Sequence, residues 1–242
     1  MEQMQILLAI LVLLPFVSAL LLALCGSDRM RRLIVYGSAG VLMISAVAFA
    51  VCFFSGENLQ LRFLQSGGII DHTMLALEAG FAVLITVLGI KYRRYYVAVL
   101  SIVQTVLTFV YELGGYKPAV QPYNLFTDQL TVIMVLIIAV VGTLITVYAV
   151  GYMRDYHNHH KEYTDRRRFF FAMLYVFLGA MFGLVLSNSL LWLYFFWEIT
   201  SLVSFLLIGY TRTKEAVQNS FRALWMNLLG LSLIHISEPT RR

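Results

Sequence analysis

Residues 190–211, LLWLYFFWEITSLVSFLLIGYT, form an apolar run that contains one charged side chain, Glu198. At 1.5 Å per residue, a helix of this length crosses the roughly 30 Å hydrocarbon core of a bilayer. The whole chain has the same character: 60% of its 242 residues are hydrophobic and 13% are charged. Soluble domains carry about 25% charged residues. The sequence therefore predicts an all-α membrane protein, a polytopic bundle of helices.

Seven segments are long and apolar enough to span the membrane, and none alternates as a barrel strand would. The predicted spans are Met4–Cys25, Leu33–Phe54, Met74–Ile90, Tyr95–Tyr111, Gln129–Met153, Phe169–Ser187 and Leu190–Thr211. The second half of Met74–Tyr111 follows a tight KYRR turn, which favours a helical hairpin. A further apolar run, Ala223–Ile236, predicts the start of an eighth helix.

Basic residues fix the predicted orientation, because cytoplasmic loops are enriched in Lys and Arg. The loops after the odd-numbered spans hold Arg29, Arg31, Arg32, Lys91, Arg93, Arg94, Arg154, Lys161, Arg166, Arg167, Arg168, Arg212, Lys214 and Arg222. The opposite loops hold only Arg62 and Lys117. This alternation predicts an N-terminus outside the cell. It also explains the net charge of +5 without a nucleic-acid partner.

The last residues, LSLIHISEPTRR at 231–242, differ from the rest of the chain. Residues 231–241 can be back-translated codon by codon into a transposase adapter used in sequencing libraries. We expect 231–242 to be an adapter artefact and the natural sequence to stop near Gly230, in mid-gene. His235 and Glu238 are therefore not candidates for function.

Glu198 is the strongest functional candidate because it lies about 12 Å into its span. An ionised group at that depth costs roughly 2.5–3.5 kcal/mol on insertion scales. Helical spacing places Tyr194 and Ser201 on the same face, which makes a thin polar stripe suited to proton translocation. The alternative is a carboxyl group satisfied by helix packing, with no role in transport.

Two other acidic residues are weaker candidates. Glu78 lies about one and a half turns into its span, and we favour a side chain that snorkels outward or serves packing. Asp128 stands at a helix start, where N-terminal capping explains it, with Thr127 as a second capping residue. Gly179, Gly183 and Ser187 form a small-residue ridge that predicts close helix packing.

The loop HNHHKEYTDRRR contains His157, His159 and His160, but no carboxylate or thiolate stands at a defined ligand spacing. We favour a solvated cytoplasmic loop over a metal site. No phosphate-binding glycine loop, hydrolytic triad or haem-ligating pair is present. The sequence thus predicts no cofactor, no bound metal and no catalytic chemistry.

Three stretches resemble the antiporter-like subunits of respiratory complex I and related complexes. They are LFTDQLTVIMVLIIAVVGTLITVYAVGYM, RRFFFAMLYVFLGAMFGLVLSNSLLWLYFFWEITSLVSFLLIGY and KEAVQNSFRALWMNLLG. The relatives include energy-converting hydrogenases and multi-subunit cation/proton antiporters. MQILLAILVLLPFVSALLLAL is similar to the usual opening helix of this family. Roughly half the chain is covered.

The resemblance implies roles for two residues. Glu198 matches a glutamate on the fifth conserved helix, which pairs with a lysine on a later helix, and Asp128 matches an acidic residue that opens the third. The lysine would lie beyond Gly230. The family usually has two helices before the position of Asp128, whereas this chain has four. The hairpin 74–111 therefore resembles an insertion. It would belong to an N-terminal part that comprises residues 1–113. Residues 114–230 then begin the antiporter-like domain.

The resemblance implies a proton- or sodium-translocating subunit in the inner membrane of a prokaryote. Our first expectation is a non-redox subunit of a redox-driven complex, such as an NADH-quinone oxidoreductase or an energy-converting hydrogenase, with other membrane subunits as partners. The alternative is a subunit of a redox-independent Na⁺/H⁺ antiporter. A solute carrier or membrane scaffold is a third possibility, which would show inverted repeats or no need for Glu198.

Overall fold

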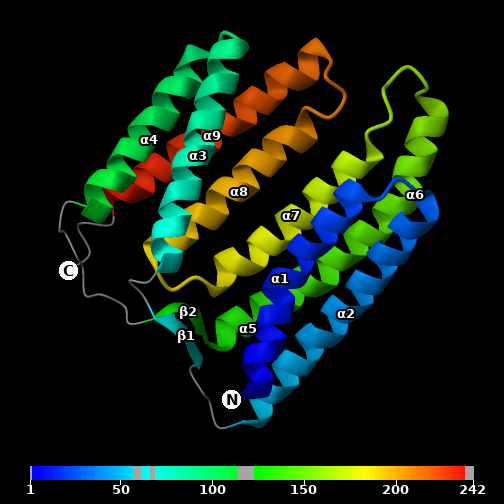
Figure 1. Cartoon of the computed structure of the whole chain (residues 1–242), viewed down its shortest axis with the longest axis vertical. Helices are drawn as coiled ribbons and strands as arrows, with labels where there is room; N and C mark the ends of the chain where they lie inside the picture. Colours follow the sequence, from blue (N-terminus) through cyan, green and yellow to red (C-terminus); the bar gives the residue numbers. More distant parts are fainter. Residues whose placement is uncertain (1, 57–60, 66–68, 114–122, 238–242) are drawn as a thin grey trace. The chain divides into compact units, whose positions relative to one another are not determined.

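The computed structural model describes residues 2–56, 61–65, 69–113 and 123–237, and its chain divides into two compact units. The first unit comprises residues 1–63 and 125–187, and the second comprises 64–124 and 188–242. Both units are helical bundles, and each is described by itself. Figure 1 labels their helices in the order in which they follow one another along the chain.

The first unit contains α1 (Glu2–Leu24), α2 (Asp28–Ser55), a long interrupted helix and α7 (Arg167–Leu186). The interrupted helix consists of α5 (Gln129–Ile137), a π-helical turn η1 (Ile138–Gly142) and α6 (Thr143–His159). The α1–α2 turn and the α6–α7 loop lie at the same end of this unit (Figure 1). Many of its large hydrophobic side chains are exposed, among them Leu20, Ile44 and Leu130.

The small-residue ridge on α7 serves packing, as the sequence predicted. Helices α1 and α7 share the most extensive contact in the unit. A β-carbon at Gly179 would lie 2.9 Å from the Phe16 ring, which is closer than carbon atoms can pack. Ser187 follows the end of α7, and its Oγ donates a hydrogen bond to the carbonyl of Gly183 at 2.7 Å, so its hydroxyl is satisfied by the last turn of that helix. The missing side chain at 179 therefore allows α1 to approach α7.

The second unit contains α3 (Ile69–Lys91), α4 (Tyr95–Leu113), α8 (Leu190–Ile208) and α9 (Lys214–Ser237). Helices α3 and α4 form the hairpin expected around the KYRR turn. All four helices contribute to one apolar core, made of Ile85, Val97, Leu202, Phe205, Phe221, Leu224 and Leu228. Helix α9 starts nine residues before the predicted apolar run, because Lys214–Arg222 is also helical.

Six helices of the described residues are long and apolar enough to cross a membrane. They correspond to all the predicted spans except Tyr95–Tyr111, since the apolar helix described there, Tyr95–Val110, is shorter. The chain is thus a multi-pass membrane protein, while the count of seven spans with an eighth begun, and the outside N-terminus, stay predictions. Cys25 and Cys52 are both free thiols.

Two short strands depart from the all-helical prediction. Strands β1 (Leu61–Gln65) and β2 (Tyr123–Thr127) pair as a two-stranded sheet. Leu125 of β2 also forms an isolated bridge with Ser187 at the end of α7. Both strands lie in connections between helices, where backbone groups need partners that a helix no longer provides.

The predicted orientation can be tested at the two ends of α2. In a variant with Cys25 and Cys52 replaced by Ser, a cysteine is introduced as Ser27→Cys or as Gly56→Cys. If the N-terminus is outside, a membrane-impermeant maleimide should label Gly56→Cys in right-side-out vesicles, and Ser27→Cys only after permeabilisation. The reverse labelling would contradict the orientation.

The α1–α7 contact predicts a selective effect of glycine substitution. Gly179→Leu should lower the free energy of unfolding by about 1–3 kcal/mol because the new side chain overlaps Phe16. Gly37→Leu is the matched control, because a β-carbon there meets nothing within 4 Å. Thermal unfolding in detergent measures both variants, and equal effects would show that Gly179 has no special packing role.

Candidate functional site

Glu198 lies in the middle of α8, inside the second unit. The helix starts after Ser189, whose side chain accepts a hydrogen bond from the Trp192 N–H at 3.3 Å and so caps the first turn. Eight residues later, about 12 Å along the helix, the side chain of Glu198 is only 4% exposed. The predicted stripe is buried with it, since Tyr194 and Ser201 are also inside the bundle.

The direct partner of Glu198 is Gln104 on α4. The Nε2 amide group of Gln104 donates a hydrogen bond to Oε1 of Glu198 at 2.8 Å, and Gln104 is 1% exposed. Sequence reasoning missed this residue because it looked for polar partners only on the helix that carries Glu198. The available signal was the spacing of Ser101, Gln104 and Thr108, which form a second buried polar stripe on an apolar helix.

Glu78 on α3 lies in the same part of the bundle. The hydroxyl of Ser101 donates to the carbonyl of Ala82 at 3.3 Å, which fixes the register of the α3–α4 hairpin. Because the two helices are antiparallel, Glu78 and Gln104, each about one turn farther from the KYRR turn, lie at the same level. Helix α3 also contacts α8, where the rings of Phe81 and Phe195 stack at 6.0 Å.

The expectation that Glu78 snorkels outward is wrong. Its side chain is 1% exposed and is near enough to Glu198 for the two charges to interact. The sequence placed it near the start of a span but could not show that α8 covers this face. Glu78 is buried because α3 packs against α8, and no local sequence pattern reveals that contact.

The cluster formed by Glu78, Gln104, Tyr194, Glu198 and Ser201 is called the acidic cluster below. Among the described residues of the second unit, its two carboxyl groups are the only buried charged side chains. Three of its oxygens, Glu198 Oε2, Gln104 Oε1 and Ser201 Oγ, have no hydrogen-bond partner in the described part of the chain. Burying two ionised carboxylates in this way costs free energy unless a proton or a cation neutralises their charge.

The donor set of the acidic cluster limits its chemistry. It offers carboxyl, amide and hydroxyl oxygens, which suit protons and hard cations rather than transition metals. Within the described residues there is no group of three or more His, Cys, Asp or Glu side chains that could hold a metal ion. The arrangement is able to take up and release a small positive charge.

The remaining sequence candidates lie elsewhere. Asp128 caps α5: its carboxylate accepts a hydrogen bond from the Thr131 N–H at 2.7 Å, which confirms the predicted cap and lowers the pKa of Asp128. His157 and His159 belong to the last turn of α6 rather than to the predicted loop, and His160 caps the end of that helix. His157 lies 3.7 Å from Asp165, and His160 lies 3.7 Å from Glu162. Neither group belongs to the unit that contains the acidic cluster.

The fold and the acidic cluster define a class: a multi-pass membrane protein with carboxyl groups buried among its helices. Two family models match the chain. Residues 121–170 match the N-terminus of chain 5 of NADH-ubiquinone oxidoreductase (complex I), and residues 187–237 match the transmembrane region of the NADH:quinone oxidoreductase/Mrp antiporter family. Over these two stretches the chain is similar to the complex I/Mrp antiporter-like family.

Curated relatives in two staphylococci show the same similarity. Na(+)/H(+) antiporter subunit A1 of Staphylococcus haemolyticus is 32% identical over 142 residues, which is 58% of this chain and 17% of the relative. The subunit of the same name from Staphylococcus aureus strain N315 is 28% identical over 181 residues, 67% of this chain and 22% of the relative. The chain thus matches less than a quarter of the length of these relatives.

The hairpin that carries Glu78 and Gln104 lies outside both matched ranges, whereas α8 with Glu198 lies inside the second. The hairpin as an insertion, and the division of the chain at residues 113 and 230, stay predictions.

The Gln104–Glu198 bond predicts energetic coupling between α4 and α8. Gln104→Leu should destabilise the protein by about 1–3 kcal/mol, because the buried carboxyl group loses its donor. The double variant Gln104→Leu/Glu198→Leu should be less destabilised than the sum of the single variants.

Thr105→Val supplies the matched control for this cycle. Thr105 neighbours Gln104, and its hydroxyl bonds within α4 to the carbonyl of Ser101 at 2.8 Å. Thermal unfolding in detergent should show additive effects for Thr105→Val with Glu198→Leu. Additivity in the Gln104 cycle as well would contradict the proposed contact.

Proposed function

We propose that the chain is part of a cation- and proton-translocating subunit of a multi-subunit Na⁺/H⁺ antiporter. The observation that carries this proposal is the buried carboxyl group of Glu198, bonded to Gln104 and close to Glu78. Intramembrane carboxyl groups that face a protein interior typically belong to ion pathways.

The relatives favour the antiporter over the redox-driven complex that was our first expectation. Both quoted relatives bear the name Na(+)/H(+) antiporter subunit A1, and one family model covers both kinds of complex. We therefore place the subunit among other membrane subunits of an antiporter, working without an electron donor, in the inner membrane of a prokaryote. Its ions would be H⁺ and Na⁺.

The acidic cluster supports exchange by a simple electrostatic argument. A proton on Glu198 removes its charge, and a cation held by the cluster oxygens compensates that charge instead. At an effective dielectric constant of about 20, two unit charges about 4 Å apart interact by about 4 kcal/mol. A proton and a cation therefore compete for the same negative charge, and gain of one favours release of the other.

Gln104 orients the carboxyl group in this scheme. Its amide N–H groups can only donate, so the Oε1 atom of Glu198 is held as an acceptor, while Oε2 remains available for a proton or cation. Ser201 and Tyr194 supply hydroxyl groups on the same helix face, one turn to either side. Asp128, which is already committed to its cap, has no part in the exchange.

The proposal is tested with Glu198→Gln in the full-length subunit, assembled with its partner subunits. In everted vesicles without an electron donor, added Na⁺ should dissipate a pH gradient when the subunit is unaltered. Glu198→Gln should reduce this antiport at least tenfold, because the amide carries neither charge nor exchangeable acid. Glu78→Gln should give a smaller loss.

Glu215→Gln is the matched control, because Glu215 is an exposed residue of the first turn of α9. It should leave antiport unchanged, with assembly of all variants checked by immunoblot. Full antiport in assembled Glu198→Gln would eliminate the role of this carboxyl group. Activity that depends on a quinone or NADH would instead support the redox-driven alternative.

A further inference from the structure

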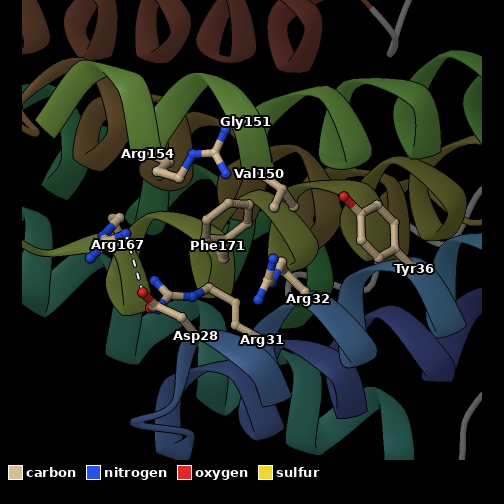
Figure 2. Close-up of a pocket in the computed structure, with 9 residues that line it drawn as sticks. All are labelled: Asp28, Arg31, Arg32, Tyr36, Val150, Gly151, Arg154, Arg167 and Phe171. Atoms are coloured by element: carbon tan, nitrogen blue, oxygen red, sulfur yellow. Dashed lines mark hydrogen bonds and ion pairs between the residues drawn. The ribbon is translucent and has the colours of Figure 1, made fainter. Parts of the chain in front are cut away.

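A basic pocket of about 350 Å³ opens in the first unit, outside the acidic cluster. It lies where α2 and α7 begin and α6 approaches its end, so three helices distant in sequence converge on it (Figure 2). Four arginines line it, and Asp28 is the one carboxylate among the lining residues. The arginines are Arg31, Arg32, Arg154 and Arg167.

Arg31 forms the base of the pocket. It is 6% exposed, forms an ion pair with Asp28, and its guanidinium lies 5.8 Å above the centre of the Phe171 ring. Asp28 also lies 3.6 Å from Arg167, so one carboxylate is shared between two guanidinium groups. Arg167 is also paired with Asp165, at 2.7 Å, so the two guanidinium groups at the base are matched by two carboxylates. The excess positive charge of the pocket therefore comes from the two arginines at its rim.

Arg32 and Arg154 stand at the exposed rim. No ion pair joins Arg32 to a carboxylate of the described residues, and Arg154 pairs only with its exposed neighbour Asp155, at 3.5 Å. The beginnings of α2 and α7 add the partial positive charge of helix N-termini. The pocket therefore attracts an anion, and guanidinium groups are suited to bind the oxygens of a phosphate.

The deeper wall of the pocket is apolar. Tyr36 lies two turns into α2, about 12 Å beyond Asp28, and Figure 2 shows Val150 between Tyr36 and the Phe171 ring. Gly151 leaves space there, since a β-carbon would meet nothing within 4 Å. Charge at the helix ends and an apolar wall toward the middle of the span match a phospholipid, whereas a free phosphate ion would gain nothing from the apolar wall.

We propose that this pocket binds the headgroup of an anionic phospholipid, with the start of its acyl chains along Tyr36 and Val150. By the distribution of basic residues, this end of the unit faces the cytoplasm, whose leaflet presents anionic headgroups to basic segments. The lipid would connect α2, α6 and α7 at the ends where the loops leave the membrane.

The test uses the purified full-length subunit in phosphatidylcholine vesicles that contain a minority of spin-labelled phosphatidylglycerol. The unaltered protein should hold phosphatidylglycerol in preference to spin-labelled phosphatidylcholine. Arg32→Gln/Arg154→Gln should reduce that preference roughly tenfold, because each basic residue near the surface adds to anionic-lipid binding. Gly151→Leu should also reduce it, by filling the apolar wall without changing charge.

Arg29→Gln is the matched control, because Arg29 is exposed on the same turn of α2 and does not line the pocket. Arg29→Gln should keep the preference for phosphatidylglycerol within about twofold. If it lost as much preference as Arg32→Gln/Arg154→Gln, the effect would come from general surface charge, and the proposal would be overturned. No effect of Gly151→Leu, or displacement of the labelled lipid by inorganic phosphate, would also overturn it. Thermal unfolding checks that each variant remains folded.

Discussion

The second unit depends on one constraint: a carboxyl group at the centre of an apolar helix needs a hydrogen-bond partner inside the bundle. Gln104 is that partner for Glu198. The two stripes of buried polar residues on α4 and α8 therefore face one another. The apolar core of Ile85, Leu202, Phe205 and Phe221 occupies the rest of the same four helices. Packing supplies the stability of this unit, and the hydrogen bond decides which helix faces meet.

The first unit is organised differently, by close approach and by charge at the helix ends. Where side chains are absent, as at Gly179, backbones come together, and where the helices enter the aqueous phase arginines and carboxylates gather. Asp165 illustrates the second effect, because hydrogen bonds from Arg167 lower the pKa of its carboxyl group to about 2. The carboxylate therefore stays ionised, and this ion pair persists, at any pH well above 2.

Much of the fold could be predicted because membrane helices are encoded locally, by length and apolarity. The hairpin around KYRR, the burial of Tyr194 and Ser201 beside Glu198, and the cap at Asp128 all followed from spacing along one helix. What could not be predicted depends on contacts between helices. Gln104 and Glu78 joined the site only because α3 and α4 pack with α8, and β1 and β2 paired across segments far apart in the sequence.

The π-helical turn at Ile138–Gly142 has a geometric consequence for the long helix that it interrupts. A π turn contains more residues than an α turn, so the faces of α5 and α6 are rotated relative to a continuous helix. Gly142 closes that turn, and any side chain there would overlap Leu178 of α7. A single helical period drawn through residues 129–159 would therefore assign the side chains of α5 or of α6 to the wrong face.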